Sequence, residues 1–182
     1  LFSKYNDALA AHGETVPLPQ AAEKFDYEAE LVIVMGQPAW QVSEEDAADK
    51  IFGYTCGNDL SARDAQFVSG QWLIGKTFPK FAPAGPYIVP KEELAAEQGA
   101  ISCRVNGNLA QSSNTADMIF KPATIVSYAS HYTPLSPGDL IFTGTPEGVI
   151  LGKPKGSRKW LQAGDQIAVE IEGIGTLKNR LA

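Results

Sequence analysis

The amino-acid sequence predicts a mixed α+β fold dominated by β-strands, with a few short helices. Three observations support this fold class. The chain has 17 Gly and 12 Pro among 182 residues, which favours frequent turns and short strands. Most apolar runs have strand length and end at Gly, Pro or Asn. Segments with helical periodicity are few and short.

The first half of the chain predicts two strands and one helix ahead of a loop. Residues 26–36 form an apolar run closed by Gly, which predicts a strand. Ser43 followed by acidic residues is typical of a helix start, and we expect this helix to reach about Phe52. Residues 53–59 predict a short strand, and residues 78–86, rich in Pro and Phe, predict an irregular loop. Beyond the loop we expect a short strand at 87–89 and a short helix at 91–98.

The second half predicts two hairpins with one helix between them. Asn106-Gly107 separates residues 101–105 from 108–111, and this dipeptide favours a type I′ hairpin turn because both central residues take positive φ. The spacing of apolar residues predicts a helix over 122–132. The remaining expected elements are a buried strand at 140–143 and a last hairpin formed by 166–171 and 175–179.

No repeat, low-complexity segment or linker divides the sequence. We therefore expect an extended N-terminal lead-in over residues 1–20 and one domain over residues 21–182. The sequence does not begin with Met, which leaves room for a segment upstream of residue 1.

Charge and composition exclude several classes of function. The net charge is -6 and the pI about 4.9, so we expect no nucleic-acid partner. The one basic cluster is interpreted as a solvated loop; it comprises Lys153, Lys155, Arg158 and Lys159. No apolar run reaches the ~18 residues of a membrane span, and no signal peptide is visible. The two cysteines lack a CxxC partner, which favours unpaired thiols, a reducing compartment and a cytoplasmic location.

Glu28 and Glu30 are the first candidate functional residues. Residues two apart on a strand point to the same face, so the two carboxylates project together. Each negative charge raises the pKa of the other carboxyl unless a cation compensates, and hard divalent cations choose oxygen ligands. The alternative is a strand end that faces solvent and carries two ordinary glutamates.

Three further positions could carry chemistry. Asp59 directly follows a predicted strand and could line a site, although it could also cap the next turn. Lys76 follows an apolar run and could aim its ammonium at a developing oxyanion, although it could equally be a surface lysine. Thr145 follows Gly144 at a strand end and could donate to a carboxylate, or could belong to a plain turn.

The two histidines are weaker candidates. His131 follows a helix face, which favours packing or a surface position. His12 and Glu14 could act as an acid/base pair, but a plain loop is the more common role for such residues.

Together and in this order, the candidate residues resemble the catalytic, C-terminal-type domain of the fumarylacetoacetate hydrolase family, which includes acylpyruvases and 2-hydroxyhepta-2,4-diene-1,7-dioate isomerases. The matching stretches cover nearly the whole chain: Phe2-Ser3-Lys4, 26–31, Gly53-Tyr54-Thr55, 58–64 with Gln66, Gly75-Lys76, Phe81-Ala82-Pro83, Asn106-Gly107, 117–120 and 137–146. The resemblance implies a mixed β-roll, a homodimer, and Mg²⁺ or Mn²⁺ at the mouth of the roll.

The resemblance also assigns roles to residues of this chain. It implies that Glu28, Glu30 and Asp59 bind the metal. It implies substrate contacts for the side chains of Arg63, Gln66, Lys76 and Thr145, with Lys76 as the catalytic residue. Many members of the family carry a His–Glu pair on a segment near the N-terminus, and we expect that motif before residue 1, because His12 and Glu14 match neither its spacing nor its place.

The implied function is a Mg²⁺-dependent hydrolase that cleaves a C–C bond of an acylpyruvate-type 2-oxo acid, in aromatic catabolism. The same chemistry would serve an isomerase of an unsaturated 2-oxo diacid or an oxaloacetate decarboxylase, because all three reactions stabilise an enolate. The partner in each case is a small anionic 2-oxo acid. A different class of function also stays open, namely a non-catalytic β domain with a structural cation site.

Overall fold

The computed structural model describes all residues, 1–182, and contains two five-stranded sheets, a two-stranded sheet and short helices. The first sheet has the strand order β1(Leu9–Ala10), β7(Ala82–Pro90), β5(Ile51–Asn58), β4(Ala29–Met35) and β10(Leu140–Phe142). The second has the order β2(Thr15–Val16), β12(Gly175–Leu181), β11(Gln166–Ile171), β8(Ala100–Val105) and β9(Asn108–Asn114). The small sheet pairs β3(Phe25–Asp26) with β6(Ser61–Ala62).

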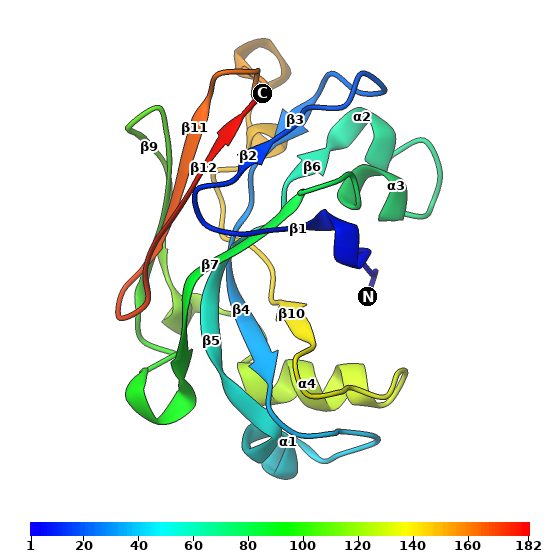
Figure 1. Cartoon of the computed structure of the whole chain (residues 1–182), viewed down its shortest axis with the longest axis vertical. Coiled ribbons are helices and arrows are strands. Elements are labelled where there is room, and N and C mark those ends of the chain that lie inside the picture. Colours follow the sequence, from blue (N-terminus) through cyan, green and yellow to red (C-terminus); the bar gives the residue numbers. More distant parts are fainter.

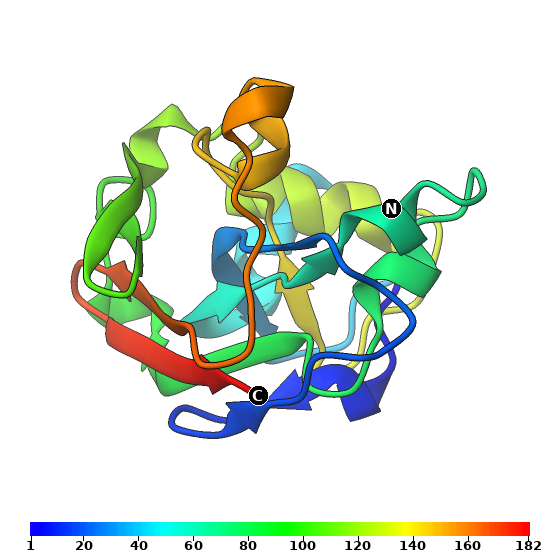
Figure 2. The ribbon, with the colours of Figure 1, turned by 90° about the horizontal axis from the view of Figure 1, so that it is seen from above.

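The two large sheets pack against each other, α1 and α4 lie at the lower end of the molecule, and α2 and α3 lie along its upper right side (Figure 1; Figure 2). The helices are α1(Glu44–Lys50), α2(Arg63–Gln66), α3(Leu73–Lys76) and α4(Pro122–Ser130). Short 3-10 turns occupy Asn6–Ala8, Lys91–Glu93, Thr115–Asp117, Ile150–Gly152 and Lys155–Ser157. No helix is both long and apolar enough to cross a membrane. The fold is therefore the β-dominated mixture that the sequence predicts.

Strand β4 is buried on both faces, and its two faces have different roles. Leu31, Ile33 and Met35 belong to the core cluster, which also contains Val169 and Leu177 of the second sheet. Each such side chain contributes about 1.5–3 kcal/mol to stability through burial. Residues at even positions alternate to the other face. The core thus lies between the sheets, and Glu30 lies on the face turned away from it.

The opposite face of the first sheet is tightly packed around Gly57 of β5. A Cβ atom at this position would lie 2.3 Å from Cγ2 of Val32 and 2.6 Å from Cε1 of Phe142. Such distances are far below van der Waals contact, so only glycine fits between these two side chains. β10 pairs only with β4, at this edge of the sheet. The prediction of a buried strand at 140–143 is therefore wrong in its burial, because the residues of β10 are half-buried.

The loop expected at 78–86 is wrong from Ala82 onward, because β7 runs from Ala82 to Pro90. Proline lacks an N–H group and is tolerated where a strand has one free edge. β7 pairs with β5 on one side, whereas β1 covers its other side only at Ala82 and Pro83. The strand therefore accommodates residues whose composition favoured a loop.

Three expected helices are shorter than the pattern indicated, and the one expected over 122–132 ends at Ser130. The first ends at Lys50, since Ile51 is buried and pairs with Met35. The second is only a 3-10 turn at Lys91–Glu93. Short helices depend on tertiary packing for their stability. No residue of this turn is buried, and the residue after it, Leu94, packs against the core. The hairpins agree with prediction, and Asn106 and Gly107 take φ values of 50° and 80°.

The N-terminal segment contributes strands to both large sheets. β1 pairs in parallel with β7, and β2 pairs in parallel with β12. Cys56 and Cys103 are buried and unpaired, and burial raises the pKa of each thiol to about 12. Neither thiol is therefore in the reactive thiolate form at neutral pH.

Candidate metal centre

Three carboxylates meet where β4 begins and β5 ends. Glu28 precedes β4 and Glu30 lies within it, on the same face. Asp59 follows the last residue of β5, and its backbone N–H donates to the carbonyl of Glu28 at 2.9 Å. One oxygen from each carboxylate lies within 4.8 Å of the others. The antiparallel pairing of β4 with β5 thus gathers the residues that the sequence singled out.

All three carboxylates are withdrawn from solvent. The exposed fractions of Glu28, Glu30 and Asp59 are 9%, 2% and 2%. These values exclude the alternative of a solvent-facing strand end. Burial raises the pKa of Glu30 well above its ordinary value, and the negative charges of Asp59 and Glu28 raise it further. The Gly144 N–H donates to Oε2 of Glu30 at 2.8 Å and only partly offsets this effect.

This donor set fits a hard divalent cation. Mg²⁺ and Mn²⁺ favour carboxylate oxygens, and the three acids offer oxygens close enough to share one ion. Glu30 has no ion-pair partner within the chain, so a cation would relieve the cost of its buried negative charge.

Lys76 is buried between two of the acids. It is 2% exposed, and its Nζ lies 2.7 Å from Oε2 of Glu28 and 2.7 Å from Oδ2 of Asp59. The interpretation as a surface lysine is therefore wrong. Short α3 ends at Lys76 and aims the ammonium at the carboxylates. A fixed, water-excluded positive charge is the arrangement that stabilises developing negative charge.

A second ammonium, that of Lys4, was assigned no role from the sequence. It forms an ion pair with Oδ1 of Asp59 and donates to the carbonyl of Phe81 at 2.6 Å. Burial lowers the pKa of Lys4, although the charge of Asp59 acts in the opposite direction. The Phe2-Ser3-Lys4 stretch carried the family resemblance, but sequence spacing alone did not place Lys4 beside Asp59, which is 55 positions away.

Arg63 binds two acids and one amide. Its Nη2 lies 2.7 Å from Oε1 of Glu28, its Nε lies 3.0 Å from Oδ2 of Asp26, and its Nη1 lies 2.9 Å from Oε1 of Gln66. The structure therefore brings Arg63 and Gln66 to the centre, where Arg63 binds the Glu28 carboxylate of the predicted metal set and Gln66 binds Arg63. Asp26 was missed, because an acid at a strand end gives no sign of its arginine partner.

Thr145 stands beside the backbone between the two glutamates. Its hydroxyl donates to the carbonyl of Ala29 at 2.9 Å and accepts from Nε2 of Gln111 at 2.9 Å. Oε1 of Gln111 accepts from the Ala29 N–H at 3.0 Å, so this buried amide braces the same strand. Gln111 was missed, since a glutamine in a predicted hairpin is usually exposed.

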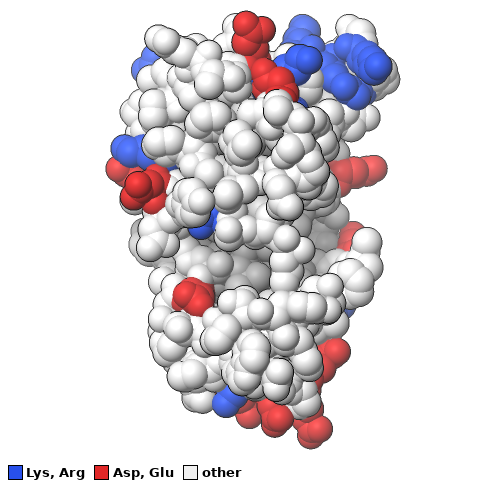
Figure 3. Space-filling view, turned by 90° about the vertical axis from the view of Figure 1, so that its right-hand side faces the viewer, with Lys and Arg blue, Asp and Glu red and all other residues white.

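A cavity of about 450 Å³ adjoins Thr145. It is lined by Leu31, Ile101, residues 113–115, 117–120 and 143–147. Separately, the face on the right-hand side of Figure 1 is hollowed near its centre (Figure 3). None of the three carboxylates lines the cavity of about 450 Å³, which adjoins the centre through Gly144, whose N–H donates to Glu30, and through Thr145.

The histidines bond elsewhere. His12 accepts at Nδ1 from the Lys178 N–H, Glu14 binds Lys80, and Nδ1 of His131 pairs with the carbonyl of Ser127. Neither ring forms a hydrogen bond with Glu28, Glu30 or Asp59. No acid/base pair formed by His12 and Glu14 is therefore present at the carboxylates.

Known proteins similar to this chain belong to the family that the sequence resembles. The family model described as "Fumarylacetoacetate (FAA) hydrolase C-terminal" matches residues 1–182. A fumarylacetoacetate hydrolase domain-containing protein 2 homolog of Dictyostelium discoideum is 44% identical over 193 residues, which span 100% of this chain and 63% of the relative. The mitochondrial oxaloacetate tautomerase fahd2 of Xenopus laevis is 40% identical over 183 residues, spanning 98% of this chain and 56% of the relative.

Solved structures have the same fold. A 2-hydroxyhepta-2,4-diene-1,7-dioate isomerase from Mycobacterium marinum matches with a TM-score of 0.90 and 40% identity, covering 98% of this chain and 67% of its own. Fumarylpyruvate hydrolase from Pseudomonas aeruginosa, in complex with Mn²⁺ and pyruvate, matches with a TM-score of 0.89 and 34% identity. The match covers 100% of this chain and 77% of the hydrolase chain. The chain spans 63% and 56% of the length of the two curated relatives.

Proposed function

Because the chain belongs to the fumarylacetoacetate hydrolase family, we propose that it is a divalent-metal enzyme acting on a small 2-oxo acid. The observation that carries the proposal is the cluster of three buried carboxylates within 4.8 Å, with the ammonium of Lys76 between two of them. Glu28, Glu30 and Asp59 would hold Mg²⁺ or Mn²⁺. A relative that contains Mn²⁺ and pyruvate supports both the metal class and the substrate class.

The local charge favours an anionic substrate once a cation is bound. Four acids, Asp26, Glu28, Glu30 and Asp59, face three basic side chains, those of Lys4, Arg63 and Lys76. The formal charge of this group is therefore -1, and a divalent cation changes it to +1. An anion binds more readily to a site of net positive charge.

Each residue has a separate task in the proposed mechanism. A bound divalent cation supplies Lewis-acid polarisation of the 2-oxo group. Lys76 stabilises negative charge that develops on the substrate oxygen, from a position fixed by two carboxylates. Arg63 orients Glu28 through a charge-assisted hydrogen bond. Thr145, held by Gln111, lines the cavity and orients the substrate.

Among the reactions that begin in this way, we favour keto–enol tautomerisation or isomerisation of a 2-oxo diacid. In such a reaction a proton leaves the carbon beside the carbonyl and another is placed on the oxygen, with no water consumed. Relatives named as an oxaloacetate tautomerase and as a dioate isomerase support this choice, at 40% identity each.

Hydrolysis of a C–C bond, which the sequence resemblance ranks first, is the second candidate. It is supported by the 34% identical fumarylpyruvate hydrolase. Hydrolysis requires an activated water, and the imidazoles of His12 and His131 bond away from the carboxylates. Oxaloacetate decarboxylation needs no water and is included in the test.

A substrate panel with Mg²⁺, with Mn²⁺ and with chelator tests the proposal. The panel holds oxaloacetate, an unsaturated 2-oxo diacid, an acylpyruvate and fumarylpyruvate. Tautomerisation or isomerisation that stops on chelation and returns with metal is the expected result. Hydrolysis alone would favour the second candidate. Cation binding without any turnover would favour a β domain with a structural cation site.

A further inference from the structure

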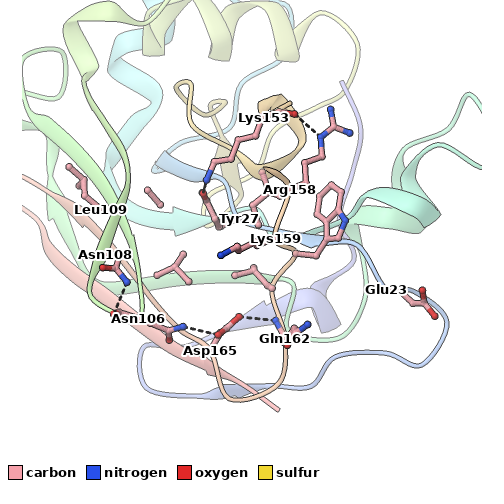
Figure 4. A pocket seen from close by; sticks show the side chains of 15 residues that line it. Glu23, Tyr27, Asn106, Asn108, Leu109, Lys153, Arg158, Lys159, Gln162 and Asp165 are labelled. Carbon is pink, nitrogen blue, oxygen red and sulfur yellow. Dashed lines mark hydrogen bonds between the residues drawn. The ribbon is translucent and has the colours of Figure 1, made fainter. Parts of the chain in front are cut away.

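A cavity of about 640 Å³ lies at the end of the molecule where the β8–β9 hairpin faces the segment 153–162 (Figure 4). None of its lining residues is one of the three carboxylates or lines the cavity of about 450 Å³, although the backbone N–H groups of Tyr27 and Ile150 donate to Asp26, the partner of Arg63. Tyr27 lines it, and its side chain points away from Glu28 because neighbouring residues in extended chain face opposite sides. The two cavities are therefore separate.

The floor of this cavity is apolar. Ile150 and Leu161 are 3% exposed, and Leu109, at 55% exposed, stands on the hairpin side. The hydroxyl of Tyr27 donates to the carbonyl of Gly148 at 2.9 Å. A surface of this kind accepts an alkyl or aromatic body.

The rim is basic on one side. Arg158 and Lys153 are half-buried, and the Arg158 Nε donates to the Lys153 carbonyl at 2.8 Å. The Lys153 Nζ lies 3.4 Å from the hydroxyl of Tyr27. Lys153 and Lys159 extend toward the middle of the cavity in Figure 4. The interpretation of this basic cluster as a solvated loop therefore fits Lys155 and Lys159, which are exposed, but not the half-buried Lys153 and Arg158.

The two acids of the rim do not neutralise these cations. Both oxygens of Asp165 are engaged, one by Nδ2 of Asn106 and the other by the Gln162 N–H, each at 2.8 Å. Glu23 points away from the other lining side chains (Figure 4). Lys153 and Lys159 thus have no carboxylate partner within the cavity, in a protein whose net charge is -6.

We propose that this cavity binds a small amphipathic anion, with an alkyl or aryl body on the floor and a carboxylate or phosphate head against Lys153 and Lys159. The half-buried indole of Trp160 supplies one flat wall for the body. This site shares none of the three carboxylates of the metal centre, and its proposal does not rest on the reaction proposed there.

Calorimetric titration with 1-naphthyl phosphate and 1-naphthoate, both in EDTA, tests the proposal on the 182-residue chain. The two probes distinguish a phosphate head from a carboxylate head, and EDTA prevents chelation at the metal centre. We expect saturable binding of at least one probe. The neutral analogue 1-naphthol and inorganic phosphate should each bind at least about tenfold more weakly, because 1-naphthol lacks the anionic head and phosphate lacks the aromatic body.

The decisive variant is Lys153→Gln/Lys159→Gln, and Lys91→Gln/Lys178→Gln is its control with the same change in net charge. Affinity should fall about tenfold or more in the first and stay unchanged in the second. The indole N–H resonance of Trp160, assigned with Trp160→Phe, should shift on binding to the wild type. Equal affinity in both double variants, or no saturation in the wild type up to millimolar probe, would overturn the proposal.

Discussion

The guanidinium of Arg63 links Asp26 to Glu28, with 3.0 Å between Nε and Oδ2 of Asp26 and 2.7 Å between Nη2 and Oε1 of Glu28. Asp26 also accepts from the backbone N–H groups of Ile150 and Leu151, at 2.8 and 2.9 Å. The guanidinium of Arg63 is thus held by Asp26, and Asp26 is itself held in place by two backbone N–H groups. This arrangement determines how Glu28 is presented to a cation.

Replacement of Arg63 by Lys should weaken metal binding. A lysine keeps the charge but cannot donate to Asp26, Glu28 and Gln66 together. We expect a 10–100-fold loss of Mg²⁺ affinity, as is usual when a partner that orients a metal ligand is removed. Calorimetry on Arg63→Lys gives the affinity, and Arg104→Lys on an exposed strand position is the matched control. An unchanged affinity in Arg63→Lys would show that Glu28 needs no such support.

Glu30→Gln should abolish stabilisation by metal. In the wild type, Mg²⁺ at about 100 times its dissociation constant should raise the free energy of unfolding by about 2.7 kcal/mol. The variant removes one of three carboxylates and should show little or no shift of Tm. The control is Glu147→Gln, which lies outside the carboxylate cluster. A full shift in Glu30→Gln would remove this residue from the metal site.

Lys76→Met should separate catalysis from metal binding. The substitution keeps much of the side-chain volume but removes the ammonium between Glu28 and Asp59. We expect kcat to fall about 10²–10³-fold, by analogy with removal of one group that stabilises an oxyanion, while calorimetry still shows Mg²⁺ binding. Lys80→Met, at an exposed ion pair, serves as control. Unchanged turnover of the preferred substrate would remove Lys76 from the mechanism.

The raised pKa of Glu30 predicts a pH dependence of stability in EDTA. Its causes are burial, then the charges of Asp59 and Glu28. A carboxyl whose pKa is higher in the folded state stabilises the fold fully below its unfolded-state pKa, and this contribution is lost as pH rises through the folded-state pKa. The free energy of unfolding of the wild type should therefore fall relative to Glu30→Gln as pH rises above about 4.5. Urea titrations across this range give the comparison, and parallel profiles would contradict the assignment.

Gly57→Ala should destabilise the fold beside the centre. The added methyl group would overlap Val32 and Phe142, at 2.3 and 2.6 Å. Overpacking of this kind costs about 1–3 kcal/mol. Gly70→Ala is the control, because no atom lies within 4 Å of its added Cβ. Urea unfolding of both variants measures the difference, and equal stabilities would show that β10 moves aside at little cost.

Local patterns in the sequence predicted much of the fold. The Asn106-Gly107 turn, the last hairpin and the strand that carries Glu30 depend on nearest neighbours and on period-two alternation. β7 could not be predicted in this way, because its prolines are accommodated only by a free sheet edge that tertiary pairing creates. The helix expected at 91–98 fails for the related reason that its stability depends on packing.

The candidate site shows the same division. Glu28 and Glu30 share a face by strand geometry, and Asp59 was recognisable at a strand end. Their approach to Lys76 and Arg63 followed from the family resemblance, since no local pattern carries it. Lys4, Asp26 and Gln111 were not assigned, because each is joined to the centre by a contact between residues distant in sequence.

The metal dependence of the proposed reaction can be measured on the enol–keto conversion of oxaloacetate, followed in Mg²⁺, in EDTA and after Mg²⁺ is restored, against the same buffers without protein. We expect an enzyme-dependent rate that is lost in EDTA, returns with Mg²⁺, and is absent from Glu30→Gln while that variant remains folded. A rate that persists in EDTA, or that Glu30→Gln retains in full, would contradict a metal-dependent reaction at the carboxylates of Glu28, Glu30 and Asp59.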